Sequence, residues 1–310
     1  MSDWAVIRVG YRRVPVRPQE GDTYKKPGDP VSTFHDLSFA LFPHFFDPYR
    51  RLWHFLVNPR KQARKAKKII TVSESTKEDV ASLYRIKRKK IVPIYLGISQ
   101  TFRRFAQTKT KKTKDDQTLE EYGLNPQKPF FLYLGTLEPR KNINGIIKAF
   151  NEFKTKTNSS HSLVIAGAKG WSFDGIMREA ANSSFKEDII FTGPVKSADR
   201  PLLMSRASLF LFPSFFEGFG FPVLEALFCR VPTITSATSS LMEIFGKYTL
   251  PVNPHDVGEI AWAMERLLND KVLKKSLAEE GEKFAQGFTW EKTARKTLNV
   301  LRAAGGKEDC

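Results

Sequence analysis

The sequence predicts an α/β protein with a doubly wound parallel sheet, and two observations lead to that prediction. Short apolar runs bounded by turn residues recur along the chain, and each is of strand length and rich in β-branched or aromatic residues, as buried parallel strands are. Amphipathic stretches separate them: Ile143, Ile146, Ile147 and Phe150 follow helical spacing, and so does the stretch Ile260–Leu268. Strands that alternate with helices predict βαβ units.

The expected elements follow in chain order. The predicted strands are Ile69–Val72, Ile91–Leu96, Phe130–Leu134, Leu163–Ala166, Ile189–Phe191, Leu209–Phe212 and Pro232–Thr235. Residues 1–30 are rich in Pro, Gly and Arg and predict no definite element, whereas residues 31–100 predict a shorter α/β set. Residues 103–118 are polar and charged without periodicity, so a loop between domains is expected there. Phe288–Leu301 predicts one final helix.

Composition places the chain among ordinary globular proteins. The 310 residues are 41% hydrophobic and 27% charged, which is enough to bury a core without disulfides. The two cysteines, Cys229 and Cys310, exclude a disulfide framework and a zinc site built on cysteine pairs, so a reducing compartment is expected. The sequence has neither a signal-peptide core nor eighteen consecutive apolar residues, so secretion and membrane spanning are not expected.

The net charge of +17 is unevenly distributed. Residues 1–116 contain 26 Lys+Arg against 11 Asp+Glu, whereas residues 117–310 contain 24 against 22. Such asymmetry favours an anionic partner for the first part, such as membrane lipid, nucleic acid or a phosphorylated substrate, and a solvated basic face is the alternative. The sequence has no helix-turn-helix, RNA-binding or zinc-module signature, so no nucleic-acid partner is expected.

The first candidate binding segment is residues 131–142. The common phosphate motifs, GxGxxG and GxxxxGK[ST], are absent, as is an Asp-x-Asp metal triplet. A predicted strand ends at Gly135, and Arg140 and Lys141 stand at the start of the next helix, with Asn142 as a candidate N-cap. Two cations at the carboxyl end of a parallel strand suit a pyrophosphate, whereas the alternative is a solvated basic pair.

The second segment is residues 212–227, where a strand runs into a Gly- and Phe-rich loop and then a helix. Glu217 lies in the loop, and Glu225 lies about one turn inside the helix, which has Pro222 near its start. Gly218 and Gly220 allow close approach of the backbone to a ligand. The two carboxylates suit sugar and ribose hydroxyls, and the alternative is that Glu225 is a helix-surface residue.

The third segment is residues 32–45, in which His35 and Asp36 follow a short apolar run. A histidine at a strand end can bond a substrate hydroxyl or act as an acid or base. A structural turn is the alternative for this pair.

Together these segments resemble the retaining GT-B glycosyltransferases that use nucleotide sugars, glycosyltransferase family 4. The family's E-x7-E element is matched from Glu217 to Glu225, including its Glu-Gly-Phe-Gly opening, and its Gly-x-x-x-Pro-Arg-Lys-Asn element from Gly135 to Asn142. The strings HDLSF, ITVSESTKEDV and IVPIYLGI resemble its late N-domain and interdomain segments, and FTWEKTARKTL resembles its last helix. The resemblance extends from about residue 30 to about residue 300.

The resemblance implies a role for each candidate residue. Arg140 and Lys141 would hold the donor diphosphate, and Glu225 the ribose. Glu217 would hold the donor sugar together with the backbone of the loop, Gly193 would pack against the base, and His35 would contact the sugar. The implied donor-binding set is Gly135, Thr136, Arg140, Lys141, Gly193, Gly218, Phe219, Gly220, Phe221 and Glu225, and the implied catalytic pair is Glu217 and His35.

The implied reaction is transfer of a hexose with retention of configuration. The resemblance implies that the diphosphate leaves and the acceptor attacks on the same face of the sugar, and that the donor phosphate helps to deprotonate the acceptor. Glu217 is then a donor-positioning residue rather than a nucleophile. No cofactor and no metal are implied, which fits the absent Asp-x-Asp. The segments HDLSF and GTLEPRKN are similar to those of the mannosyltransferase-like branch of the family. This similarity favours GDP-mannose as the donor, with a glycan or lipid-linked acceptor.

The resemblance also implies a division into domains. Residues 1–116 are expected to form a truncated N-terminal, acceptor-side Rossmann-like domain and a linker, residues 117–287 a complete nucleotide-sugar-binding Rossmann-like domain, and residues 288–310 a crossing helix and tail. Family members have a glycine-rich loop near the start that this sequence does not show before His35. Three explanations are open: a fragment of a longer reading frame, a partner chain that supplies the rest, or a non-catalytic nucleotide-sugar-binding chain.

The first domain is also expected to meet a membrane. Phe39–Phe46 and Arg50–Leu56 combine aromatic bulk with cations. This pattern, together with the basic charge of the first part, predicts peripheral binding to an anionic surface. A cytoplasmic protein on the inner face of the membrane is therefore expected.

Overall fold

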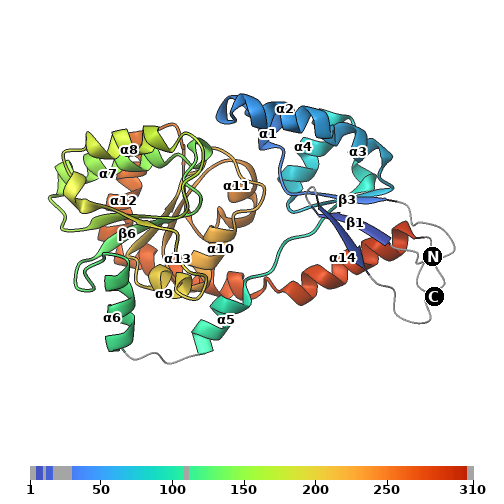
Figure 1. The fold of residues 1–310 in the computed structure, drawn as a ribbon. Helices are drawn as coiled ribbons and strands as arrows, with labels where there is room; N and C mark the ends of the chain where they lie inside the picture. The colour runs from blue at the N-terminus through green and yellow to red at the C-terminus, as the bar shows by residue number, and fades with distance from the viewer. Residues whose placement is uncertain (1–4, 10–11, 17–29, 108–111, 306–310) are drawn as a thin grey trace. The chain divides into compact units, whose positions relative to one another are not determined.

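The structure is a computed structural model that describes residues 5–9, 12–16, 30–107 and 112–305. The chain divides into two compact units, each with its own sheet (Figure 1). The first unit comprises Met1–Gly97 and Thr289–Cys310, and the second comprises Ile98–Phe288. Residues 98–116, which the sequence had assigned to the first domain and linker, therefore belong to the second unit.

The sheet of the first unit has the strand order β2-β1-β3-β4-β5. Its strands are β1 (Ala5–Val9), β2 (Arg12–Val16), β3 (Val31–Phe34), β4 (Lys68–Thr71) and β5 (Ile91–Pro93). Strands β1 and β2 form an antiparallel pair, which lies where the sequence predicted no element, and the other neighbours are parallel. The shorter α/β set expected over residues 31–100 is confirmed.

Two apolar clusters cover the two faces of this sheet, because successive side chains of a strand point to opposite sides. Ile69 packs with Leu37, Val80 and other buried residues, whereas its neighbour Ile70 packs with Ile94 and the C-terminal helix. The helices of this unit are α1 (Ser38–Leu41), α2 (Pro48–Val57), α3 (Pro59–Lys65), α4 (Glu74–Tyr84) and α14 (Trp290–Ala304). Helix α14, red in Figure 1, thus completes the core of the first unit from the far end of the chain.

The sheet of the second unit has the order β11-β10-β9-β6-β7-β8, and all of its neighbouring strands are parallel. Its strands are β6 (Phe130–Leu134), β7 (Ser162–Ala166), β8 (Ile189–Gly193), β9 (Leu209–Phe212), β10 (Thr233–Ser236) and β11 (Leu250–Val252). All five side chains of β6 are buried. The doubly wound parallel sheet predicted from the apolar runs is confirmed, and β11, only three residues long, is the strand of this sheet that the sequence did not predict.

Helices cover both faces of this sheet. Helices α7, α8 and α12 pack together on one face, and α9, α10 and α13 on the other (Figure 1). The helices of this unit are α5 (Gln100–Gln107), α6 (Lys112–Glu121), α7 (Ile143–Thr157), α8 (Phe173–Ala181), α9 (Arg200–Ser205), α10 (Phe221–Phe228), α11 (Ser239–Phe245), α12 (Val257–Asn269) and α13 (Lys271–Gln286). The helices predicted from Ile143 and Ile260 are thereby confirmed.

The loop expected over residues 103–118 is wrong, because helices α5 and α6 occupy most of it. Each of these helices buries one large apolar side chain, Phe102 in α5 and Leu119 in α6, and exposes mostly polar residues. The single anchor of α6 leaves no periodic pattern in the sequence, and the apolar spacing in α5, Phe102 and the half-buried Phe105, covers only about one turn. Contacts of α5 with α9, and an ion pair of 3.2 Å between Arg206 and Asp116, hold this segment to the second unit.

Candidate functional site

The candidate site lies where the winding direction of the second sheet reverses. Strand β6 lies between β7 and β9. From β6 the chain first adds β7 and β8 on one side, and it then adds β9, β10 and β11 in turn on the other side. The carboxyl ends of β6 and β9 therefore form the topological switch point, where open α/β sheets bind ligands. The loops that follow these two strands, residues 135–142 and 213–220, contain most of the predicted site residues.

The two loops are joined by a cluster of ion pairs. Lys141 Nζ lies 2.5 Å from Glu217 Oε1, and Arg140 Nη1 lies 3.0 Å from Glu217 Oε2. Arg140 also pairs with Glu138 at 2.6 Å and donates to the carbonyl oxygen of Phe216 at 2.6 Å. All four charged side chains are largely buried. We call Glu138, Arg140, Lys141 and Glu217 the switch-point cluster.

The charges in this cluster set the protonation of its carboxylates. Burial raises the pKa of Glu217, but Arg140 and Lys141 outweigh burial and lower that pKa to about 2. Burial also raises the pKa of Glu138, and there the opposing cations are not sufficient to bring it back. Glu217 is therefore a firmly ionised carboxylate, whereas Glu138 takes up a proton more readily than an ordinary glutamate.

Glu225, on α10, makes a second buried ion pair. Its Oε2 lies 2.8 Å from Nη2 of Arg200, the first residue of α9. Burial raises the pKa of Glu225 to about 7, and Arg200 only partly opposes this shift. The surface interpretation of Glu225 is thereby excluded, because the residue is only 5% exposed. Both predicted site glutamates are thus buried and paired with cations of the second unit.

The loop before α10 brings its backbone close to α11. Gly220 has φ of +100° and is the N-cap of α10, and Pro222 lies in the first turn as expected. A Cβ on Gly220 would come within 2.6 Å of Leu241 Cδ2. Gly218 and Phe219 are buried, whereas Phe221 is exposed. The loop is thus a close-packed backbone turn next to Glu217.

The remaining donor-binding candidates follow other strands at the same edge. Gly135 directly follows β6, and its backbone N–H donates to Ala166 at the end of β7. Thr136 beside it is exposed. Gly193 ends β8 with φ of +70° and open space where a Cβ would be. The fold therefore puts these three residues, like Glu217, at the carboxyl edge of the second sheet.

A family comparison identifies the class of protein. The chain matches "Glycosyl transferases group 1" over residues 114–284 and "Glycosyltransferase Family 4" over residues 26–102. It is 30% identical over 272 residues to O-antigen chain mannosyltransferase B of Escherichia coli, covering 88% of this chain and 70% of that protein.

The chain belongs to the group 1 glycosyltransferases.

Further relatives and solved structures agree with this assignment. The serotype-specific mannosyltransferase WbdA of Escherichia coli is 29% identical over 278 residues, and this glycosyltransferase spans only 33% of its length. The crystal structure of Anabaena HepE with UDP and glucose superposes with a TM-score of 0.71 at 18% identity, covering 88% of this chain and 71% of that one. Sucrose-phosphate synthase from Thermosynechococcus elongatus gives 0.71 at 22% identity, covering 90% and 68%. The fold is thus of the GT-B glycosyltransferase type.

His35 belongs to the first unit of the glycosyltransferase, where it follows β3 and is exposed. The neighbouring Asp36 accepts hydrogen bonds from the backbone N–H and the hydroxyl of Ser38, at 2.9 and 2.6 Å. Asp36 therefore builds the turn into α1, and His35 is the member of this pair that is available to a ligand.

Asn142 does not cap α7 with its side chain, contrary to the sequence prediction. It occupies the N-cap position, but in the left-handed region with φ of +57° and without a side-chain cap hydrogen bond. Its Nδ2 instead donates to the carbonyl oxygens of Pro213 and Pro254, at 3.1 and 2.6 Å. Asn142 thus ties the two switch-point loops together, which stabilises the position of Arg140 and Lys141.

Sequence reasoning missed three kinds of residue at this site. Glu138 pairs with Arg140, Arg200 pairs with Glu225, and the hydroxyls of Ser239 and Ser240 bond the backbone of Glu217. Arg200 was detectable in principle, because it comes after a strand at the same edge of the sheet as Arg140. The serines gave no signal, because their partners are backbone atoms more than twenty positions away.

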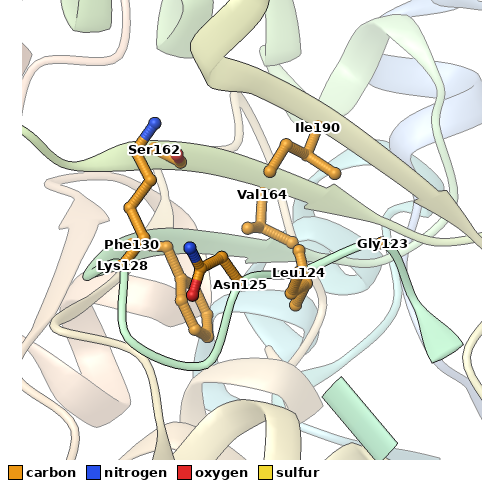
Figure 2. A pocket seen from close by; sticks show the side chains of 8 residues that line it. All are labelled: Gly123, Leu124, Asn125, Lys128, Phe130, Ser162, Val164 and Ile190. Atoms are coloured by element: carbon orange, nitrogen blue, oxygen red, sulfur yellow. The ribbon is translucent and has the colours of Figure 1, made fainter. Parts of the chain in front are cut away.

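The second unit also contains a cavity of about 200 Å³ that is separate from this site (Figure 2). Phe130 and Ser162, which begin β6 and β7, help to line it, so it lies at the amino edge of the sheet. Its other lining residues are Gly123, Leu124, Asn125, Lys128, Val164 and Ile190. The switch-point cluster lies at the opposite, carboxyl edge, so the cavity contributes nothing to the candidate site.

Proposed function

We propose that this glycosyltransferase moves mannose from GDP-mannose to a glycan or lipid-linked acceptor with retention of configuration. The observation that carries the proposal is the switch-point cluster: two buried cations at the place where a parallel sheet binds ligands. The identity to an O-antigen chain mannosyltransferase supports mannose as the transferred sugar. The resemblance of HDLSF and GTLEPRKN to the mannosyltransferase-like branch supports GDP-mannose as the donor.

In this proposal Arg140 and Lys141 bind the donor diphosphate. Both side chains are already held in position by Glu217, so little rotamer entropy is lost when the ligand binds. A diphosphate beside Glu138 raises the pKa of that carboxyl further, because like charges repel. Arg140 then exchanges its contact with Glu138 for a bidentate contact with phosphate oxygens.

The other contacts of the donor follow the family resemblance. Glu225 accepts from the ribose hydroxyls, Gly193 packs against the base, and Glu217 with the backbone of Phe219 and Gly220 holds the sugar. Gly135, Thr136, Gly218 and Phe221 complete the donor-binding set. His35 stays a proposed contact of the donor sugar.

The proposed reaction breaks the bond between the sugar's anomeric carbon and the diphosphate oxygen and forms one to the acceptor oxygen on the same face. The leaving diphosphate accepts the acceptor's hydroxyl proton, so no protein base is needed. Arg140 and Lys141 stabilise the negative charge that grows on the diphosphate as the bond breaks. Glu217, with its pKa of about 2, stays ionised and positions the sugar rather than attacking it. No metal takes part in the proposed reaction.

Calorimetric titration of the purified chain with GDP, UDP and ADP tests the donor assignment. We expect about micromolar affinity for GDP and weaker binding of the other two nucleotides. Turnover is then measured with GDP-mannose and a mannose-terminated acceptor, and the anomeric configuration of the product is read by NMR. A folded chain that binds none of the nucleotides contradicts the proposal, and binding without turnover supports only a nucleotide-sugar-binding role.

We further propose that the glycosyltransferase binds peripherally to an anionic membrane on its cytoplasmic face. No helix in the described residues is long and apolar enough to cross a membrane. Helix α2 instead exposes large apolar side chains, including Phe55 (78%) and Leu56 (70%), and also contains Arg50 and Arg51. An exposed apolar face with neighbouring cations is typical of helices that lie in a membrane interface.

Sedimentation with phosphatidylglycerol vesicles at low salt tests this membrane proposal. We expect the wild-type chain to sediment and a variant with Phe55→Ser and Leu56→Ser to remain largely in solution. Val272→Ser is the matched control, because it also removes an exposed apolar side chain but from α13 of the second unit. A wild-type chain that stays in the supernatant refutes membrane binding.

A further inference from the structure

The first unit contains a strongly basic cavity that the transfer reaction does not use. The cavity has a volume of about 610 Å³, within the range of pockets that hold small ligands. Seven of its eight lining residues are cationic and none is acidic; they are Arg64, Lys67, Lys68, Arg85, Lys87, Lys89 and Lys90, with Ile86 as the apolar member.

This basic cavity lies at the amino edge of the first sheet. Lys68 is the first residue of β4, and Lys89 and Lys90 directly precede β5. His35 follows β3 and therefore lies at the opposite, carboxyl edge of the same sheet. A ligand in the basic cavity is thus separate from the edge at which open α/β sheets bind their substrates.

Hydrogen bonds to the backbone position two of the cations. Lys90 Nζ donates to the carbonyl oxygen of Arg64 at 2.8 Å, which joins the end of α3 to the start of β5. Lys68 Nζ lies 3.5 Å from the carbonyl oxygen of Lys89. Neither contact neutralises a charge, because a carbonyl is a dipole rather than an anion. These two contacts therefore hold Lys68 and Lys90 in place at the cavity, and both lysines keep their positive charge.

A nearby carboxylate is engaged by another cation. Glu78 binds Arg88 through Nε at 2.8 Å and Nη2 at 2.6 Å, and Arg88 does not line the cavity. The seven lining cations thus face one space without an acidic lining residue, and their mutual repulsion costs folding free energy. An anion with several charges close together offsets that repulsion better than separate monovalent ions do.

We propose that the basic cavity binds clustered phosphate groups, either as a soluble oligophosphate or as the headgroups of anionic phospholipid. Arginine suits phosphate through paired N–H donors, and lysine suits it as a point charge on a flexible stem. The lining contains both types, so it accommodates phosphates in more than one arrangement.

Calorimetric titration of the full chain with inorganic tripolyphosphate tests the proposal, with Lys87→Gln combined with Lys89→Gln as the variant. Both side chains are exposed, so we expect the variant to fold. The control combines Lys271→Gln and Lys275→Gln, which remove the same charge from exposed positions of α13 in the second unit. We expect affinity to fall about tenfold or more in the cavity variant and to stay within about twofold in the control.

A Lys141→Ala variant separates this site from the switch-point cluster. Tripolyphosphate affinity that survives Lys141→Ala and falls in the cavity variant supports the proposal. Affinity that is lost in Lys141→Ala, is equal in the cavity variant and the wild type, or is too weak to measure in the wild type at 50 mM salt overturns it.

Vesicles identify the source of the phosphate. If lipid headgroups are the ligand, the wild-type chain sediments with phosphatidylglycerol vesicles, tripolyphosphate displaces it, and the cavity variant sediments less than the control. If a soluble oligophosphate is the ligand, the cavity variant loses tripolyphosphate binding while its sedimentation equals that of the control. Phosphatidylcholine vesicles provide the uncharged comparison.

Discussion

Glu217 and Glu225 show how burial and neighbouring cations act against each other on the charge of a buried glutamate. Burial acts on both in the same direction, because removing a carboxylate from water disfavours its charged form. Glu217 has two cations within 3.0 Å and its pKa falls to about 2, whereas Glu225 has one, Arg200, and its pKa rises to about 7. The first is a fixed negative charge, and the second is a group that titrates near neutral pH.

The raised pKa of Glu225 predicts a loss of stability as pH rises. Between about pH 4.5 and pH 7 the native state holds this proton while the unfolded chain releases it, so the free energy of unfolding falls with pH in this window. Glu225→Gln removes that fall, although it leaves Arg200 without its ion pair at every pH. We expect the difference in free energy of unfolding, variant minus wild type, to increase by about 2 kcal/mol as the pH rises from 5 to 8.

Urea unfolding at pH 5, 6, 7 and 8 measures this difference. The matched control is Glu152→Gln, an exposed glutamate on α7, for which we expect the same pH dependence as in the wild type. A difference between Glu225→Gln and the wild type that does not change with pH contradicts a raised pKa at Glu225.

Lys141→Ala is predicted to weaken GDP binding. The substitution removes a charge-assisted contact with the diphosphate in a largely buried position, which costs on the order of 2–4 kcal/mol. It also leaves Glu217 with Arg140 as its remaining cation in the cluster. Calorimetry with GDP measures the effect, and circular dichroism confirms that the variant is folded.

Lys148→Ala is the control for this change, because Lys148 is an exposed lysine on α7 outside the switch-point cluster. Equal GDP affinity in Lys141→Ala and Lys148→Ala removes the diphosphate role from Lys141.

At the scale of elements, the turn before α10 depends on one glycine. Gly220 combines φ of +100° with a position where a Cβ would lie 2.6 Å from Leu241. Gly220→Ala is therefore predicted to destabilise the protein by about 1–3 kcal/mol, through strain and displacement of α10. Because α10 contains Glu225, GDP affinity falls as well.

Gly175→Ala is the matched control for Gly220→Ala. Gly175 lies within α8, and a Cβ there meets no heavy atom within 4 Å. Alanine favours a helix over glycine, so we expect this control to be neutral or to stabilise by up to about 1 kcal/mol. Urea denaturation compares the two variants, and equal stability would falsify the strain argument for Gly220.

Helix α5 depends in the same way on one apolar residue. Phe102 is 2% exposed, and α5 contacts α9, which begins with Arg200. Phe102→Ala is predicted to cost about 3–5 kcal/mol, because the helix has no other buried side chain to hold it. Chemical denaturation measures the loss, and an effect below 1 kcal/mol would show that α5 contributes little to the second unit.

At the scale of the whole molecule, the switch-point cluster and Glu225 both lie in one continuous stretch, Ile98–Phe288. That stretch has its own six-stranded sheet with helices on both faces. We therefore predict that the segment 98–288 folds alone and binds GDP within about threefold of the full chain's affinity. Thermal unfolding followed by circular dichroism, and then calorimetry, measures both properties.

A folded segment that has lost GDP binding would assign part of the nucleotide site to the first unit. The same segment with Lys141→Ala is the negative control for specific binding.

The local pattern of the sequence determined the central architecture of the second unit. The predicted runs Phe130–Leu134 and Leu209–Phe212 coincide with β6 and β9, because a strand buried on both faces needs apolar residues without interruption. The sequence also predicted Arg140, Lys141 and Glu217 at the carboxyl edge of the sheet, because they follow these strands and the carboxyl ends of parallel strands share one edge. Helices α5 and α6 could not be predicted, because the apolar spacing of α5 covers only about one turn and α6 buries a single large side chain in a polar stretch.

The tertiary structure alone decided how these charges pair. Glu138, Arg140 and Lys141 are neighbours in the chain, yet Glu217, which binds both cations, is 76 positions beyond Lys141. Arg200 and Glu225 likewise meet only because α9 and α10 pack on the same face of the sheet. Residue type and spacing can place a charged group at an edge of a sheet. Its burial and its partner, which together set its pKa, depend on contacts between segments far apart in the chain.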